Sequence, residues 1–238
     1  MTLNMPSPGE IIVAQWNQTA NEMVMRYGIV RGTSEFLCRV LDDEYLGNQI
    51  ALVSSFGIES AVSLKLMAEI NPSIPVILVN TGYLFCQTFK YRDLLKTHLR
   101  LTDVRTPGPT QEQFMSFNPY GDPPTCCDAV KKEISMQALR DFPVWISGRK
   151  RYQGGARSDL PMVELFEDKI KLNPMALWTE THIESFMREH ELPDNPLKAM
   201  GYGSAGCASC TIPGRGREGR WPGKGKMECG LHIDGSGI

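Results

Sequence analysis

One cysteine lies in a short motif near the C-terminal end of the sequence, Glu228-Cys229-Gly230-Leu231-His232. The glycine-rich surroundings lack the apolar periodicity of a packed core, so we expect residues 213–238 to form a mobile tail that displays the thiol. The thiolate is the nucleophilic form of cysteine, and neighbouring cations favour it. Because a run of arginines and lysines precedes the motif, Cys229 is the candidate nucleophile.

Four further cysteines have the number and spacing of a metal centre. Cys126 and Cys127 are adjacent, and Cys207 and Cys210 form a C-x-x-C motif. Four thiolates can hold either a tetrahedral zinc ion or an iron–sulfur cluster. Adjacent cysteines point in divergent directions, which favours the larger 4Fe–4S cluster over a single ion. A redox-active C-x-x-C pair, with Cys126 and Cys127 simply buried, is the alternative.

The remaining cysteines and a nearby lysine complete this part of the sequence. If residues 128–139 form a helix, Lys131 lies one turn after Cys127 on the same face. A cation there would offset the negative charge of four thiolates. Cys38 lies in an apolar helical pattern typical of a core, and we expect Cys86 to be a spectator in a turn.

The composition indicates the class of protein. A chain of 238 residues with 42% hydrophobic and 22% charged residues is typical of one globular domain that buries a core without disulfides. The net charge of −2 gives no reason to expect nucleic acid or a membrane as a partner. No apolar run approaches the ~20 residues of a membrane span, and the first ten residues lack a signal-peptide pattern. We therefore expect a cytoplasmic protein whose cysteines bind metal, react or are buried.

Short apolar strands alternate with helical patterns through the middle of the chain. We expect strands at residues 49–54, 75–80, 101–105 and 144–147, with helices at 61–70 and 87–98 between them. This alternation predicts an α/β fold with a mostly parallel sheet and helices on both faces.

Three regions of one domain follow from these patterns. Residues 1–46 form an N-terminal helical cover, with helices at 11–27 and at 35–46, the second capped by Thr33 or Ser34. Residues 47–212 form the α/β domain, with a hairpin or edge strands at 161–166 and 169–172 and a helix at 179–189. Residues 213–238 form the tail.

The loop after the first strand has the character of an anion site. Ser54, Ser55, Gly57 and Ser60 supply small side chains and hydroxyl donors between a strand and a helix, where backbone N–H groups and the helix dipole face a bound phosphate. The loop lacks the lysine of a Walker motif and the glycines of a dinucleotide fingerprint. A tight turn with no ligand is the alternative.

Two other strand ends add polar residues at the same edge of the predicted sheet. Asn80 follows the second strand, and Gly148-Arg149-Lys150-Arg151 follows the fourth. Ligands of open α/β sheets bind at the carboxyl ends of the strands. These ends together suit a nucleotide that carries phosphate or sulfate groups, and a solvated basic turn at 149–151 is the alternative.

These motifs together resemble the sulfonucleotide reductases of sulfate assimilation, particularly the cluster-bearing adenylyl-sulfate (APS) reductases. Residues 54–60 resemble the modified PP-loop of that family, and residues 80–85 resemble its D-T-G-Y-L-F segment. Cys126-Cys127 with Lys131, and residues 206–211, match its C-C…G-C-x-x-C-T signature. Residues 217–221 resemble its R-x-G-R-W element, and residues 228–232 match its E-C-G-L-H tail.

The resemblance implies a fold and a reaction. The fold is an adenine nucleotide α-hydrolase-like (PP-loop) domain. The reaction is the reduction of APS to sulfite and AMP, with Cys229 forming an S-sulfocysteine and thioredoxin or glutaredoxin supplying electrons. A 4Fe–4S cluster, electrostatic and structural in role, is implied on Cys126, Cys127, Cys207 and Cys210, with Lys131 beside it. The substrate-binding residues implied are Ser54, Ser55, Gly57, Ser60, Asn80, Gly148, Arg149, Arg217 and Arg220.

The sequence departs from the family pattern at three positions. Asn80 replaces an aspartate, Val130 stands where a basic residue is common, and Leu177 stands where aspartate is frequent. The departures bear on the choice and turnover of the substrate more than on the reaction class.

Other functions stay open on the sequence alone. The chain could reduce phosphoadenylyl sulfate (PAPS) by the same mechanism, with Lys150 or Arg151 as the cation for its 3′-phosphate. It could instead be a PP-loop ATPase that thiolates nucleic acid, although the charge and the tail argue against that, or a non-catalytic redox sensor. A homo-oligomer is also open.

Overall fold

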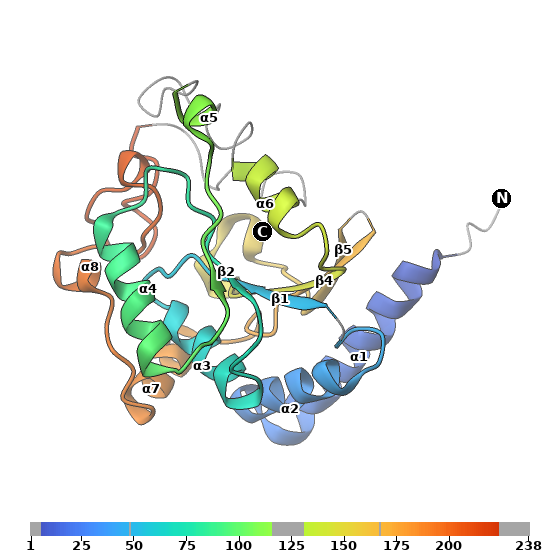
Figure 1. The fold of residues 1–238 in the computed structure, drawn as a ribbon. Coiled ribbons are helices and arrows are strands. Elements are labelled where there is room, and N and C mark those ends of the chain that lie inside the picture. The colour runs from blue at the N-terminus through green and yellow to red at the C-terminus, as the bar shows by residue number, and fades with distance from the viewer. Residues whose placement is uncertain (1–5, 48, 116–130, 167, 224–238) are drawn as a thin grey trace.

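The computed structural model describes residues 6–47, 49–115, 131–166 and 168–223. Figure 1 shows a central sheet with helices on both sides. Cys126, Cys127, Val130 and the tail motif around Cys229 lie outside the described residues, so the structure does not test what the sequence predicts for them. Within the described ranges, no helix is both long enough and apolar enough to cross a bilayer.

The sheet has six strands in the order β3-β2-β1-β4-β6-β5. Its strands are β1 (Ile50–Val53), β2 (Val76–Ile77), β3 (Val104–Arg105), β4 (Val144–Ser147), β5 (Val163–Phe166) and β6 (Lys169–Leu172). All neighbours are parallel except β5, an antiparallel edge strand on β6. The chain runs outward from β1 to β3 and then returns to the other side of β1 with β4. The strand order therefore reverses between β1 and β4, which is where open α/β sheets bind ligands.

Helices cover both faces of this sheet. On the larger core lie α1 (Pro8–Tyr27), α2 (Ile29–Asp42), α3 (Ser60–Ile70), α4 (Cys86–His98) and α7 (Glu180–Glu189). On the other face, α6 (Lys132–Ala138) packs Ile134 against the inward side chains of Ala51, Ile77 and Trp145. Figure 1 shows α6 on the opposite side of the sheet from α2 and α3. Short elements complete the chain: α5 (Gln111–Met115), α8 (Pro196–Ala199) and 3-10 turns at Arg151–Gln153, Gly155–Arg157 and Ala208–Cys210.

The predicted mostly parallel sheet is confirmed, including the edge hairpin of β5 and β6. The predicted second and third strands were too long, because β2 spans only Val76–Ile77 and β3 only Val104–Arg105. Hydrogen bonds from Leu78 N to Arg105 O (2.9 Å) and from Asn80 N to Pro107 O (2.8 Å) nevertheless continue the pairing. The polar ends of β1, β2 and β4 therefore share one edge, as predicted.

The N-terminal helices correct one prediction. The second helix begins at Ile29, not at residue 35, because Gly28 (φ 79°) ends α1 and lets α2 start at once. Thr33 is not a cap: it lies inside α2, and its hydroxyl donates to Ile29 O (2.8 Å) and accepts from Trp178 Nε1 (2.9 Å). At Gly32 the two helices pack so closely that a Cβ would lie 2.6 Å from Met23 O.

We predict that Thr33→Val destabilises the protein by about 2 kcal/mol, because the indole N–H of Trp178 would stay buried without an acceptor. The measurement is urea unfolding. Thr19→Val is the matched control, since that hydroxyl donates to a carbonyl one turn back (3.1 Å to Gln15 O) at an exposed site. Equal losses for the two variants would contradict the role given to Thr33.

Candidate active site

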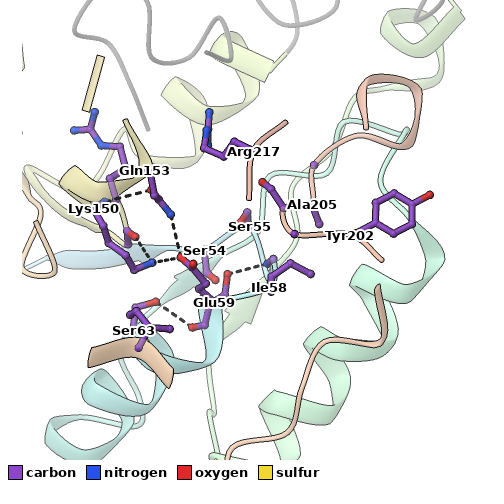
Figure 2. Close-up of a pocket in the computed structure, with 18 of the residues that line it drawn as sticks. Ser54, Ser55, Ile58, Glu59, Ser63, Lys150, Gln153, Tyr202, Ala205 and Arg217 are labelled. Carbon is purple, nitrogen blue, oxygen red and sulfur yellow. Dashed lines mark hydrogen bonds and ion pairs between the residues drawn. The ribbon is translucent and has the colours of Figure 1, made fainter. Parts of the chain in front are cut away.

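A cavity of about 870 Å³ lies at the carboxyl ends of β1 and β4. Its walls come from the loop after β1, the loop after β4, and two C-terminal segments around Ala205 and Arg217, as Figure 2 shows. The sequence-predicted site residues that line it are Ser54, Ser55, Gly57, Ser60, Lys131, Gly148, Arg149, Cys207, Arg217 and Arg220. Segments far apart in the sequence thus form one site.

The loop after β1 is rigid because its own hydroxyls bind its own backbone. Ser54 Oγ accepts from Phe56 N (3.2 Å), and Ser60 Oγ accepts from Gly57 N (2.8 Å). Phe56 is fully buried at a positive φ of 45°, and buried Asn195 donates Nδ2 to its carbonyl (3.0 Å). Two of the predicted phosphate-binding hydroxyls therefore hold the loop's shape, while Ser55 stays exposed at the cavity.

Glu59 is a cavity residue that sequence reasoning missed. Its carboxylate accepts from Lys150 Nζ (2.8 Å) and from Gln153 Nε2 (3.0 Å), as Figure 2 shows, and it also accepts from the Tyr152 hydroxyl. Burial would raise the pKa of Glu59, but the charge of Lys150 and these hydrogen bonds outweigh it and hold the pKa below its usual value. Glu59 therefore stays ionised and joins the loop after β1 to the loop after β4.

Two of the three cations in the basic turn after β4, Arg149 and Lys150, are largely shielded from solvent, whereas Arg151 is exposed. Arg149 pairs with Glu164 and donates to Asn173 Oδ1 (3.1 Å), while Arg151 Nε donates to Leu160 O (2.9 Å). Lys150 is only 3% exposed and pairs with Glu59. Of the two cations considered for a 3′-phosphate, Lys150 lines the cavity and Arg151 is not among its lining residues.

Residues 80–83, in the turn after β2, are not among the residues that line the cavity, although Leu78, Val79 and Leu84 on either side of them are. Asn80 Oδ1 accepts from Gly82 N (2.8 Å), and Asn80 is not among the lining residues. This amide therefore shapes the turn, in which the Thr81 hydroxyl and the Tyr83 carbonyl contact the cysteine motif. The substrate-binding role that the sequence predicts for Asn80 stays a prediction, and the hydrogen bond that its side chain accepts is local.

The C-x-x-C motif packs against that turn. Cys207 Sγ lies 3.2 Å from Thr81 Oγ1, and Ala208 N donates to Tyr83 O (2.7 Å). A 3-10 turn brings Cys210 N to Cys207 O (3.0 Å), and Cys210 is buried. Among the residues that the structure describes, no group of three potential metal ligands occurs, and Cys126 and Cys127 lie outside them. A hydroxyl beside one thiol and burial of the other suit ligands of an anionic centre.

Two arginines that line the cavity both lie over the indole ring of Trp221. The guanidinium carbons of Arg217 and Arg220 lie 5.4 Å and 4.5 Å from the ring centroid of Trp221. Arg220 Nη1 also donates to Ala205 O (2.9 Å), and a Cβ on Gly206 would lie 2.3 Å from its Nη2. The R-E-G-R-W segment therefore aims two held cations at the cavity, as an anionic ligand requires.

Comparison with known proteins places the chain in a family. A family model described as phosphoadenosine phosphosulfate reductase domain matches residues 49–213. The chain belongs to this family. The adenosine 5′-phosphosulfate reductase of Mesorhizobium japonicum is 40% identical over 201 residues, which cover 81% of this chain and 79% of that protein. The protein of the same name from Mycolicibacterium smegmatis is 31% identical over 233 residues, which cover 90% and 98%.

Solved structures of the phosphoadenosine phosphosulfate reductase family and of other nucleotide enzymes share the fold. The crystal structure of a PAPS reductase from Candida auris, a phosphate complex, has a TM-score of 0.68 at 20% identity and covers 88% of this chain and all of that one. FMN adenylyltransferase from Candida glabrata has a TM-score of 0.56 at 14% identity, covering 89% and 70%. The predicted PP-loop type of fold and the resemblance to the reductase family are both confirmed.

The structure explains one of the departures from the family pattern, the leucine at position 177. Leu177 is half-buried and packs against the larger core beside Trp178, so an apolar side chain suits its surroundings. A leucine here adds to packing in a place where the family often carries a charge.

We predict that Glu59→Gln destabilises the protein by about 2–4 kcal/mol, because buried Lys150 would lose its counter-charge. The folded-state pKa of Lys150, already lowered by burial, would fall further. A lysine with a lowered folded pKa binds fewer protons when folded, so the loss should be larger near about pH 6 than near about pH 9.

Urea unfolding at both pH values measures this loss. Glu35→Gln is the control, because its pair with Arg31 (3.6 Å) has side chains 41% and 70% exposed and should cost under about 0.5 kcal/mol. A loss in Glu59→Gln that is small or independent of pH would refute the ion pair as the tie between the loops.

Proposed function

We propose that this protein reduces adenosine 5′-phosphosulfate to sulfite and AMP in the cytoplasm, with thioredoxin as the electron donor. The observation that supports it most is the cavity at the β1–β4 switch point, which is lined by a PP-loop, two stacked arginines, Lys131 and Cys207. Cations and backbone amides suit a phosphosulfate, which has negative charge on both groups. The relatives named adenosine 5′-phosphosulfate reductase agree with this reading.

In the proposed reaction the thiolate of Cys229 attacks the sulfur of the sulfo group. An S–S bond forms, the S–O bond to the phosphate breaks, and AMP leaves with the bonding electron pair. Arg217 and Arg220 would stabilise the charge on the transferred group and on the phosphate. One thioredoxin thiolate then attacks Cys229 and releases sulfite, and the second thiolate frees Cys229, so the dithiol supplies two electrons.

We further propose a 4Fe–4S cluster on Cys126, Cys127, Cys207 and Cys210. The two cysteines of this set that the structure describes suit a cluster. Cys207 lies beside a hydroxyl at the cavity, and Cys210 is buried on the same turn. When bound, the cluster would supply a local electrostatic field and a cross-link between two segments. Lys131, which lines the cavity, would offset part of the negative charge of the cluster.

We favour APS over PAPS as the substrate. PAPS carries one more phosphate and needs one more cation, but Lys150 and Arg151 already bind Glu59 and Leu160 O. A sulfite-release assay with thioredoxin and both nucleotides tests this preference. Faster turnover of PAPS at equal concentration would reverse the assignment while keeping the reaction class.

We predict that Cys229→Ser abolishes sulfite release, because an alcohol at this position cannot carry the sulfo group to thioredoxin. The measurement is sulfite release from APS with the thioredoxin system. Cys86→Ser is the control: that exposed thiol donates to Gln87 Oε1 (3.1 Å) and should be replaceable. Normal turnover by Cys229→Ser would exclude the mechanism.

We predict that Cys210→Ser lowers the iron and sulfide content to near zero, because the cluster would lose one of the four thiolates that hold it. Iron and acid-labile sulfide analysis measures it. Cys38→Ser, which changes a half-buried helical thiol, should leave both unchanged. Full iron content in Cys210→Ser would remove this residue from the ligand set.

A further inference from the structure

A row of large side chains crosses the sheet on the face that α6 covers. The register pairs Trp145 on β4 with Lys171 on β6, and Lys171 with Glu164 on β5. Lys171 is fully buried: its Nζ lies 3.1 Å from Glu164 Oε1 and 4.7 Å from the centroid of the Trp145 ring. A buried ammonium costs several kcal/mol to desolvate. Packing alone gives no reason for a lysine at this position.

The carboxylate of Glu164 links this lysine to the cavity. Its Oε1 accepts from Arg149 Nη2, accepts from Asn173 Nδ2 (2.9 Å) and faces Lys171 Nζ. Arg149 lines the cavity, whereas Glu164, Asn173 and Lys171 are not among its lining residues. Asn173 also accepts from Arg149 through Oδ1 (3.1 Å), so the guanidinium is held at two points. The four residues connect the cavity wall to the interior of the sheet.

The net charge of Arg149, Glu164 and Lys171 determines the electrostatic potential that this group produces in the cavity. Arg149 and Glu164 alone would form a neutral pair, and the carboxylate would cancel the field of the guanidinium. With Lys171 protonated, one carboxylate is shared by two cations, and the group has a net charge of about +1. The positive charge reaches the cavity through Arg149, although Lys171 does not touch it.

We propose that Lys171 and Glu164 are positioning residues for Arg149: Glu164 fixes the guanidinium at the cavity wall, and Lys171 keeps the carboxylate from neutralising it toward an anionic nucleotide. This inference rests on the proposed nucleotide substrate. It assigns a function to two residues that do not line the cavity.

The protonation of Lys171 adds a pH dependence. Burial is the largest cause that lowers the pKa of Lys171, and the positive charges of Arg149 and then Arg157 lower it further. The carboxylate of Glu164 raises the pKa and offsets part of this effect, which leaves the pKa at about 7. On its own strand, Lys169 shares the face, but its Nζ donates to the carbonyls of Arg140 and Phe142 (3.2 Å each). The group therefore has its extra positive charge below neutral pH and loses it as the pH rises.

Equilibrium binding to the cluster-loaded Cys229→Ser protein tests the proposal, with APS as the anionic probe and adenosine as the uncharged one. We expect Lys171→Met to weaken APS binding about three- to tenfold and to leave adenosine binding unchanged. The double variant Glu164→Gln/Lys171→Met keeps a net charge of +1 and should recover most of the loss. Lys169→Met is the matched control on the same strand and should bind both probes normally.

The pH profile is a second measurement. APS affinity of the parent protein should fall between about pH 6 and about pH 8.5, and Lys171→Met should flatten this profile. Equal weakening of APS and adenosine in Lys171→Met, or no recovery in the double variant, would overturn the inference while leaving the proposed function intact. If the cluster-loaded Cys229→Ser protein without further substitutions does not bind APS at any pH, both the inference and the proposed function are overturned.

Discussion

The ion pair between Glu59 and Lys150 determines how the two halves of the cavity meet. It joins residues 91 positions apart, across the point where β1 and β4 run side by side. Lys150 is almost fully buried, so the loop after β4 cannot move away from the loop after β1 without leaving an uncompensated charge. Tyr152 and Gln153 add hydrogen bonds to the same carboxylate. Together with the pairing of β1 and β4, these contacts to Glu59 fix the position of one wall relative to the other.

Around this tie, each cavity cation is held in a different way. The charge of Lys150 is neutralised by one carboxylate, and Arg149 shares a carboxylate with Lys171. Arg217 and Arg220 instead lie over the indole ring of Trp221. An indole face attracts a cation without cancelling its charge, whereas a carboxylate does cancel it. The wall formed by residues 217–221 is therefore better suited to the most negative part of a ligand than Lys150 is.

The sequence predicted the architecture because burial patterns are local. Short apolar runs such as Val144–Ser147 favoured strands buried on both faces, and the polar residues after them indicated the ligand-binding edge. The start of α2 was missed because a single glycine, Gly28, lets one helix follow another without a visible loop. The partners of Lys150 and Arg149 could not be predicted, because they depend on which strands become neighbours. The hydrogen bond from Gly82 N to Asn80 Oδ1 could not be predicted from residue type either, and the substrate-binding role of Asn80 stays a prediction.

The distance in sequence between the two walls has a thermodynamic consequence. A nucleotide that contacts both loops binds only the state in which β4 has docked beside β1, and neither half alone offers a complete site. Its binding free energy therefore adds to the stability of the whole sheet, by about 2.7 kcal/mol at a ligand concentration one hundred times Kd. Added nucleotide would then slow hydrogen exchange of backbone amides in the central strands, and not only in the loops. The lifetime of the folded chain in a cell is in this way linked to the availability of its ligand.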